Sequence, residues 1–373
     1  MTGRVDLRAV LLAIAAPVIA VAFALLVSSG VLAAAGDPVG TTWEQLARAW
    51  EQPRRIAETV NQATYLYLAA LAVALGFRMN LFNIGVEGQY LLAAFSAAAV
   101  CGRIALPFPL SIALGVVVAM LVGAAWAGIA AVLKVTRGVS EVISTIMLNS
   151  IAGALVAFLL RQVAVPVAGS NNIGTEPLSE SARVPGLPLV PGSPREVFGL
   201  VVLAALAGAA FHVLVNRTRF GFDLRATGRS RTAAVASGID VRRMVIVAML
   251  LSGGMAGLVG LPLLFGEAYS YSLTFPAGVG FTGIAIALLG RNNPAGIALA
   301  ALLFAYLNVA AEPLQIRAGV ASEIVQIMQG IIVLAVVVAY ELVNRYRVAA
   351  EQRRVARELA DRPGVDRPAG ARA

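Results

Sequence analysis

The amino-acid sequence predicts an all-α integral membrane protein with about ten transmembrane helices. Of its 373 residues, 59% are hydrophobic and only 13% are charged, whereas soluble proteins carry roughly a quarter charged residues. Apolar runs of about 20 residues recur along the chain, each long enough to cross a hydrocarbon layer of roughly 30 Å. The single cysteine, Cys101, lies in one of these runs, so we expect no disulfide in the fold.

The predicted helices follow the apolar runs in order. We expect them at residues 9–33, 59–77, 82–101, 109–134, 141–161, 197–215, 244–266, 277–290, 295–311 and 323–343. This divides the chain into three parts: a first helix with an external loop (1–58), a core (59–343) with one long inner loop (216–243), and a basic cytoplasmic tail (344–373).

The distribution of basic residues predicts that both ends of the chain are cytoplasmic. With the N-terminus inside, 21 of the 29 Lys and Arg residues fall in inner segments and 8 in outer ones, as the positive-inside rule requires. The outer segments 34–58 and 162–196 mix both signs of charge, and the first predicts a short amphipathic helix from Trp43 to Trp50. The tail is expected to begin as a basic helix on anionic lipid and to end disordered.

An internal inverted repeat is predicted between helices 2–5 and helices 7–10. The second helix of each set opens with a similar sequence, "FNIGVEG" at Phe82 and "FPAGVGF" at Phe275. Sets that lie five helices apart have opposite orientations in the membrane. Transporters often place a central path between such repeats.

Polar residues at the start of the predicted third helix form the first candidate site. Asn83 and Glu87 are one turn apart and share a face if the helix begins near residue 82, and Gln89 follows. A charged group inside a membrane must face protein or water. One interpretation is a conduction path or its gate, with a broken helix at the Gly-rich opening. The other is interhelical hydrogen bonding.

A second polar cluster opens the predicted fifth helix. Ser140 stands at the N-cap position, and Glu141 and Asn149 follow on one side of the helix together with two hydroxyl residues, Ser144 and Thr145. Lining a translocation path and packing against other helices are equally open interpretations here.

The sequence contains no motif for catalysis or for ATP binding. A P-loop needs a Gly-Lys-Ser/Thr sequence, and the only lysine, Lys134, lies in "VLKVTR". There is no HExxH sequence or Cys/His ligand set either, so we expect no cofactor and no metal. Transport must therefore use an ion gradient or the energy of another subunit.

The long inner loop, 216–243, favours another subunit. It carries seven Arg and two Asp residues around a small apolar centre. Arginines alone would suffice to orient a loop, whereas a short helix with an Ala/Gly face suits insertion into a groove on a cytoplasmic partner. The residues we expect on that face are Ala233, Ala234, Ala236, Gly238 and Ile239.

Several collinear segments carry a resemblance to a known family. The sequence "AAVASGI" after "LRATG" resembles the coupling-helix loop of ABC importer permeases in the ribose and branched-chain amino acid permease superfamily. The segments "NLFNIGVEGQYLLAAF", "SEVISTIMLNSIA" and "GVGFTGIAIALLGRNNPAGI" resemble its nucleoside (simple-sugar) subgroup, and the external loops resemble the longer of two paired permeases. Asn80 and Ser140 depart from residues common in that subgroup.

The resemblance implies a multi-pass permease in the cytoplasmic membrane that is not itself an enzyme. It implies a second, similar permease, cytoplasmic ATP-binding subunits that hydrolyse ATP, an extracytoplasmic binding protein, and import, with a nucleoside as the expected substrate. Asn83, Glu87, Gln89, Glu141 and Asn149 would line or gate the path. A permease for sugars, autoinducers or branched-chain amino acids and an ion-coupled secondary transporter remain alternatives. The sequence does not fix the exact substrate, or whether the paired permeases are identical.

Overall fold

The computed structural model describes residues 7–167 and 172–360. The chain forms two compact units, Met1–Gly36 together with Gln326–Ala373, and Asp37–Val325. The larger unit contains all of the candidate site residues, so the fold is described mainly there.

The smaller unit contains α1 (Leu7–Ala35) and most of α14 (Ser322–Ala360). At 1.5 Å per residue, the 39 residues of α14 extend over roughly 58 Å, well beyond the thickness of a hydrocarbon layer. The predicted last span and the start of the basic tail therefore form one continuous helix, which confirms the helical start of the tail. The end of the tail, predicted to be disordered, lies outside the described residues.

The larger unit is a bundle of helices with small strands and turns at one end. Its elements are α2 (Val39–Arg48), η1 (Ala49–Glu51), α3 (Pro53–Phe77), α4 (Val86–Arg103), α5 (Leu110–Arg137), α6 (Glu141–Val163), β1 (Val165–Pro166), β2 (Ile173–Gly174), η2 (Glu180–Ala182), α7 (Val201–Arg217), α8 (Arg219–Arg229), α9 (Arg231–Ala236), α10 (Val241–Gly257), α11 (Leu261–Leu263), η3 (Leu264–Ala268), α12 (Val279–Leu289) and α13 (Pro294–Ala318). The short amphipathic helix predicted from Trp43 to Trp50 is present as α2 and η1, and it begins earlier, at Val39.

Six helices of the described chain are long and apolar enough to cross a membrane, and α7 with α8, bent by 70°, would make a seventh. Each predicted span has a helical counterpart, but the number ten and the repeat remain predictions. The clearest difference is α12, whose 11 residues extend over only about 16 Å. It is a half-helix, preceded by the non-helical segment 269–278.

Helices α5 and α10 pack backbone to backbone because glycines face each other. A Cβ atom on Gly257 would lie 2.1 Å from the Ala119 carbonyl oxygen, and one on Gly123 would lie 2.3 Å from the Gly253 carbonyl oxygen. Any larger residue would push the helices apart, as is typical of small-residue contacts between membrane helices. The two helices thus form a rigid pair beside the candidate site.

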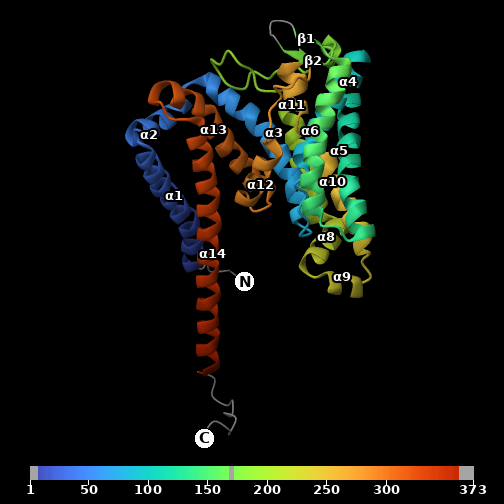
Figure 1. Cartoon of the computed structure of the whole chain (residues 1–373). Helices are drawn as coiled ribbons and strands as arrows, with labels where there is room; N and C mark the ends of the chain where they lie inside the picture. The colour runs from blue at the N-terminus through green and yellow to red at the C-terminus, as the bar shows by residue number, and fades with distance from the viewer. Residues whose placement is uncertain (1–6, 168–171, 361–373) are drawn as a thin grey trace. The chain divides into compact units, whose positions relative to one another are not determined.

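Within the larger unit, the segments predicted to be outside gather at one end and those predicted to be inside at the other. Figure 1 draws β1 and β2 at the top and α8 and α9 at the bottom. At the top, Thr175 and Leu178 donate backbone hydrogen bonds to Tyr271 and Tyr269. At the bottom, Arg78 donates to the backbone oxygen of Asn292.

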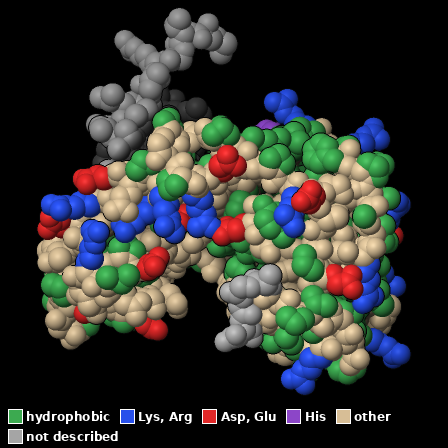
Figure 2. All heavy atoms as spheres, turned by 90° about the horizontal axis from the view of Figure 1, so that it is seen from above, with side chains coloured by type: hydrophobic (Ala, Val, Ile, Leu, Met, Phe, Trp, Pro, Cys, Tyr) green, Lys and Arg blue, Asp and Glu red, His purple; other side chains and the backbone are tan. Residues whose placement is uncertain are grey.

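The outer end carries mixed charges, in line with the predicted external loops. Figure 2, which looks down on this end, shows basic and acidic side chains interspersed. Arg195 joins two helices there by pairing with Glu58, at the start of α3, and with Glu267 in η3. Burial lowers the pKa of the Arg195 guanidinium, but the two carboxylates outweigh it and leave this pKa raised. The ion pairs therefore hold the outer loop against the bundle.

Candidate functional site

The polar residues of the first candidate site lie at the start of α4, but not all on its face. The helix begins at Val86, with Gly85 as its N-cap, so Asn83 precedes it and the prediction that Asn83 and Glu87 share a helical face is wrong. The side-chain oxygen of Asn83 accepts a hydrogen bond from the Gly85 N–H at 3.1 Å. This local turn competes with the helix, as Asn side chains often do, and shifts the helix start by one turn.

Asn83 is the centre of a buried hydrogen-bond network between three helices. Its amide pairs with the Gln89 amide through two bonds of 2.9 Å, and it also donates to the Ser252 hydroxyl of α10 at 2.8 Å. Ser252 in turn donates to the backbone oxygen of Ala72 in α3 at 2.7 Å. Asn83, Gln89 and Ser252 are almost completely buried. These contacts match the interhelical hydrogen-bonding interpretation, whereas lining a path remains a prediction for Asn83 and Gln89.

Asn149 ties α6 to the opening of α4. Its amide oxygen accepts a bond from the Gly88 N–H at 2.9 Å, and its amide nitrogen donates to the Ile84 backbone oxygen at 2.9 Å. The helices approach so closely that a Cβ on Gly88 would lie 2.8 Å from the Cβ of Ala152. Asn149 thus satisfies backbone groups that the late helix start leaves free.

Glu87 bonds to the start of the half-helix α12. Its two carboxylate oxygens accept hydrogen bonds from the Gly278 N–H at 2.6 Å and the Gly280 N–H at 2.7 Å. These are free donors of a helix N-terminus, where the helix dipole also favours a negative charge. Glu87 is only 6% exposed, so its side chain faces protein, as expected for an ionisable group within the membrane.

The starts of α4 and α12 therefore meet inside the bundle, at positions that the predicted repeat aligns. Gly85 and Gly278 are both N-caps, and Val86 and Val279 are both the first residues of their helices. This correspondence supports the predicted repeat. The pairing of Glu87 with α12 was not predicted from the sequence, and its only signal is the position of two glycines at the opening of the aligned helix.

Glu141 forms an ion pair with Lys134, the only lysine of the chain. The two residues flank the turn between α5 and α6, and their side chains are 9% and 17% exposed respectively. Glu141, Ser144 and Thr145 are buried on one face of α6, as predicted. Ser140 stands at the N-cap position, but its side chain makes no capping hydrogen bond. The ion pair gives Glu141 a structural partner within the chain, and its role in a path remains a prediction.

The predicted coupling residues lie on and after α9, at the end opposite β1 and β2 (Figure 1). The short helix is present, but Ala234 is 2% exposed and Ile239 is half-buried against a cluster that includes Met79 and Leu224. Ala234 is therefore buried within the chain, whereas Ile239 keeps part of its surface exposed, and the coupling role of these residues remains a prediction. The exposed positions of the prediction are Ala233, Ala236 and Gly238.

Two exposed apolar residues on α8 and α9 were missed by the sequence analysis. Val235 on α9 is 62% exposed and Phe222 on α8 is 63% exposed. Gly238 has a φ of +81° and ends the turn that follows α9. The segment is thus a small protrusion with an apolar tip, held by buried side chains of the bundle.

Comparison with known proteins decides the family. Residues 55–337 match the model of the branched-chain amino acid transport system / permease component family. The chain belongs to this family. Helical content and several apolar spans agree with this, so the protein is a multi-pass membrane permease and a transport subunit.

Three relatives align with most of the length of this chain. The guanosine ABC transporter permease protein NupP of Bacillus subtilis is 35% identical, over 87% of this chain and 93% of its own length. The glucose ABC transporter permease protein TsgB13 of Haloferax volcanii is 34% identical, with 96% and 94% covered. The nucleoside ABC transporter permease protein NupB of Lactococcus lactis is 32% identical, with 87% and 90% covered.

Proposed function

We propose that this permease imports nucleosides across the cytoplasmic membrane as part of an ATP-driven transporter. Two of the three relatives described above are named for guanosine or nucleoside transport, and the motifs near residues 83, 141 and 283 resemble the nucleoside subgroup. Glucose is the second candidate substrate because a relative named for glucose transport is similar over nearly the whole chain. ATP hydrolysis takes place in a partner, since this chain carries no P-loop sequence.

The observation that carries the ATP-driven mechanism is the protrusion formed by α8 and α9. Val235 of α9 and Phe222 of α8 are exposed at this end of the bundle, and an apolar groove on an ATP-binding subunit would cover such side chains. Leu224 and Ile239 pack against residues of α5 and α10, among them Ala131 and Met249. Movement of a bound ATPase would thus be transmitted directly to the rigid α5–α10 pair beside the start of α4.

The remaining partners follow from the family resemblance. A second permease would complete the translocation path, and an extracytoplasmic binding protein would deliver the substrate to the outer end with its mixed charges. The proposed path residues would then control the path indirectly, by fixing how the start of α4 meets the half-helix α12: Asn83, Glu87, Gln89, Glu141 and Asn149.

A substitution at the tip of α9 tests the proposed mechanism. Val235→Glu places a carboxylate in the proposed apolar contact, at a cost of several kcal/mol if it stays unpaired, without disturbing the bundle. Val235→Thr has nearly the same shape and serves as the matched control. With the whole transporter in proteoliposomes, we expect Val235→Glu to lose ATP-dependent guanosine uptake and to co-purify with less ATPase, while Val235→Thr retains both.

Three results would contradict parts of the proposal. Normal ATP-dependent uptake by Val235→Glu would refute the docking role of α9. Uptake by this chain in vesicles without any ATPase would refute the ATP-driven class in favour of a secondary transporter. Competition of labelled guanosine uptake by glucose, but not by other nucleosides, would transfer the assignment to the sugar candidate.

A further inference from the structure

Next to α12, part of the membrane is crossed without a helix. The 11 residues of α12 extend over about 16 Å, roughly half of a hydrocarbon layer of about 30 Å. The chain after α12 lies at the inner end, where Asn292 accepts a hydrogen bond from Arg78. The chain before α12 comes from the outer end, where Ser272 pairs with Gly174 of β2. The segment 273–278, which belongs to no helix or strand, therefore descends into the membrane to reach the start of α12.

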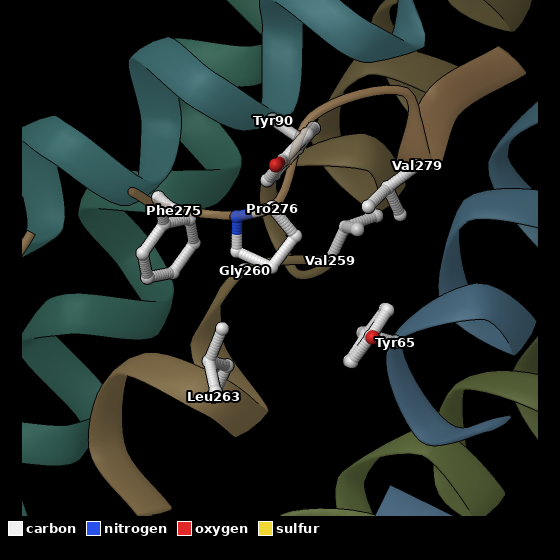
Figure 3. Close-up of a pocket in the computed structure, with 8 residues that line it drawn as sticks. All are labelled: Tyr65, Tyr90, Val259, Gly260, Leu263, Phe275, Pro276 and Val279. Carbon is white, nitrogen blue, oxygen red and sulfur yellow. The ribbon is translucent and has the colours of Figure 1, made fainter. Parts of the chain in front are cut away.

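One side of the segment 273–278 is packed against the bundle. Phe275 is 8% exposed, and Val279, which follows the segment, is 6% exposed. Figure 3 shows these two side chains and Pro276 around a small space that Tyr65 and Tyr90 also line. The space measures only about 10 Å³, which is room for no more than one water molecule. This side of the segment is therefore closed to any solute.

The other side of the segment is uncovered. Leu273 is 63% exposed, and Thr274 and Ala277 are exposed as well. The backbone is free on this side too, because within the described part of the chain the N–H and carbonyl groups of Thr274 and Ala277 have no hydrogen-bond partner. The segment thus presents polar backbone groups away from the bundle, at a depth that the hydrocarbon layer occupies.

Free backbone groups exclude lipid as the neighbour of this side. An N–H or carbonyl group without a partner is costly in hydrocarbon, so irregular backbone at membrane depth is found only where protein buries it or where it lines water. The hydroxyl groups of Ser272 and Thr274 lie 2.8 Å apart at the upper end of the segment. Hydroxyl and free backbone groups both donate and accept hydrogen bonds, which favours a water-filled path over the apolar surface of a partner.

We propose that the exposed side of the segment 273–278 lines the translocation path and binds the sugar hydroxyl groups of the transported nucleoside. The free backbone groups of Thr274 and Ala277 and the Thr274 hydroxyl are the binding groups. The inference rests on the proposed import of nucleosides. The segment ends at Gly278, whose N–H bonds to Glu87, so a bound sugar lies beside the point where α12 meets the start of α4. In transporters with discontinuous helices, substrate sites lie near such breaks.

Cysteine modification in the whole transporter tests whether the segment faces the path. In a Cys101→Ser background, Ala277→Cys should react with a positively charged methanethiosulfonate, and saturating guanosine should slow the reaction several-fold. Leu121→Cys is the matched control: Leu121 is 65% exposed in the middle of α5, where a regular helix can face lipid, and it should not react.

A second measurement tests the hydroxyl of Thr274. Thr274→Val keeps the shape of the side chain and removes one neutral hydrogen bond, which corresponds to roughly 3- to 10-fold in a binding constant. We expect guanosine uptake at sub-saturating concentration to fall by about this factor, while Thr274→Ser retains it. Uptake of dideoxyguanosine, which lacks two ribose hydroxyl groups, should be the same for the wild type and Thr274→Val, whereas a merely structural role would lower both.

The outcomes separate this inference from the proposed function. A transporter that imports guanosine but leaves Ala277→Cys unmodified, or modified at the same rate with and without guanosine, would overturn the path assignment and leave the proposed function intact. Equal loss of guanosine and dideoxyguanosine uptake in Thr274→Val would overturn the role of the hydroxyl. Protection of Ala277→Cys by glucose in a transporter without guanosine import would refute the proposed nucleoside substrate and with it the nucleoside as ligand of the segment.

Discussion

Glu87 offers a direct test of how the start of α4 and the half-helix α12 are held together. Its carboxylate accepts the N–H groups of Gly278 and Gly280 at 2.6 and 2.7 Å. Glu87→Leu would leave both donors buried without an acceptor, at about 1–3 kcal/mol each, or roughly 2–6 kcal/mol together. Removing a buried charge recovers part of its desolvation energy, so we expect a loss of about 2–4 kcal/mol in the free energy of unfolding.

Glu87→Gln should be intermediate. Its amide oxygen still accepts one N–H, while the amide nitrogen faces the other donor, so one bond is lost at about 1–3 kcal/mol. The measurement is chemical denaturation of the purified permease in detergent, followed by circular dichroism. Glu44→Leu serves as a control because Glu44, 53% exposed, pairs with Arg48 on the surface of α2, where such a pair contributes under about 1 kcal/mol.

The order of unfolding stability among the wild type and the two Glu87 variants shows whether Glu87 holds the start of α12. If Glu87→Leu unfolds at the same denaturant concentration as the wild type, Glu87 does not hold the start of α12. If Glu87→Gln is less stable than Glu87→Leu, the loss reflects a misplaced polar group and not missing acceptors. Transport measured per folded molecule then separates stability from function, and a near-normal rate for Glu87→Gln would exclude an obligatory charge in the path.

The two remaining predictions concern topology and packing. In a Cys101→Ser background, Leu189→Cys should react with a membrane-impermeant maleimide added outside intact cells. Thr232→Cys should react only after the cells are permeabilised. Labelling of position 232 from outside would refute the N-in orientation. Gly257→Val should destabilise the fold by several kcal/mol in the same unfolding assay, because its Cβ would lie 2.1 Å from a backbone oxygen. Gly153→Ala is the control: with open space around it, it should be neutral or stabilising by about 0.5–1 kcal/mol. Equal stability of the two variants would contradict the close packing of α5 against α10.

The long helices could be predicted from the sequence because hydropathy and length determine them. Helices α3, α5, α6 and α13 all appear where apolar runs of about 20 residues predict them, within a few residues for most ends. Helix α12 was predicted at residues 277–290 as one of the ten transmembrane helices, and it forms close to these bounds, at Val279–Leu289. Its apolar composition gave no sign that it is too short to cross a membrane by itself.

In the candidate site, too, the sequence predicts which residues matter locally but not which distant residues they contact. Polar residues within apolar sequence identified Asn83, Glu87 and Gln89 as members of one buried cluster. Their partners could not be predicted, since Ser252 and Gly278 lie 169 and 191 positions away and carry no charge to mark them. Ala234 was predicted to face a partner because Ala suits both a docking surface and a buried contact, and only the packing of α9 against the bundle separates the two.

The meeting of two helix N-termini at one carboxylate also determines the charge at the centre of the bundle. Each N-terminus is equivalent to roughly half a positive elementary charge, and an ionised Glu87, whose two oxygens both accept N–H groups, would contribute one negative charge. The three sum to about zero. Moving one net charge through the membrane potential requires about 2.3 kcal/mol per 100 mV, whereas an electrically balanced junction can rearrange without that term. A rearrangement that keeps Glu87 and the two N-termini together would therefore carry little net charge through the membrane potential.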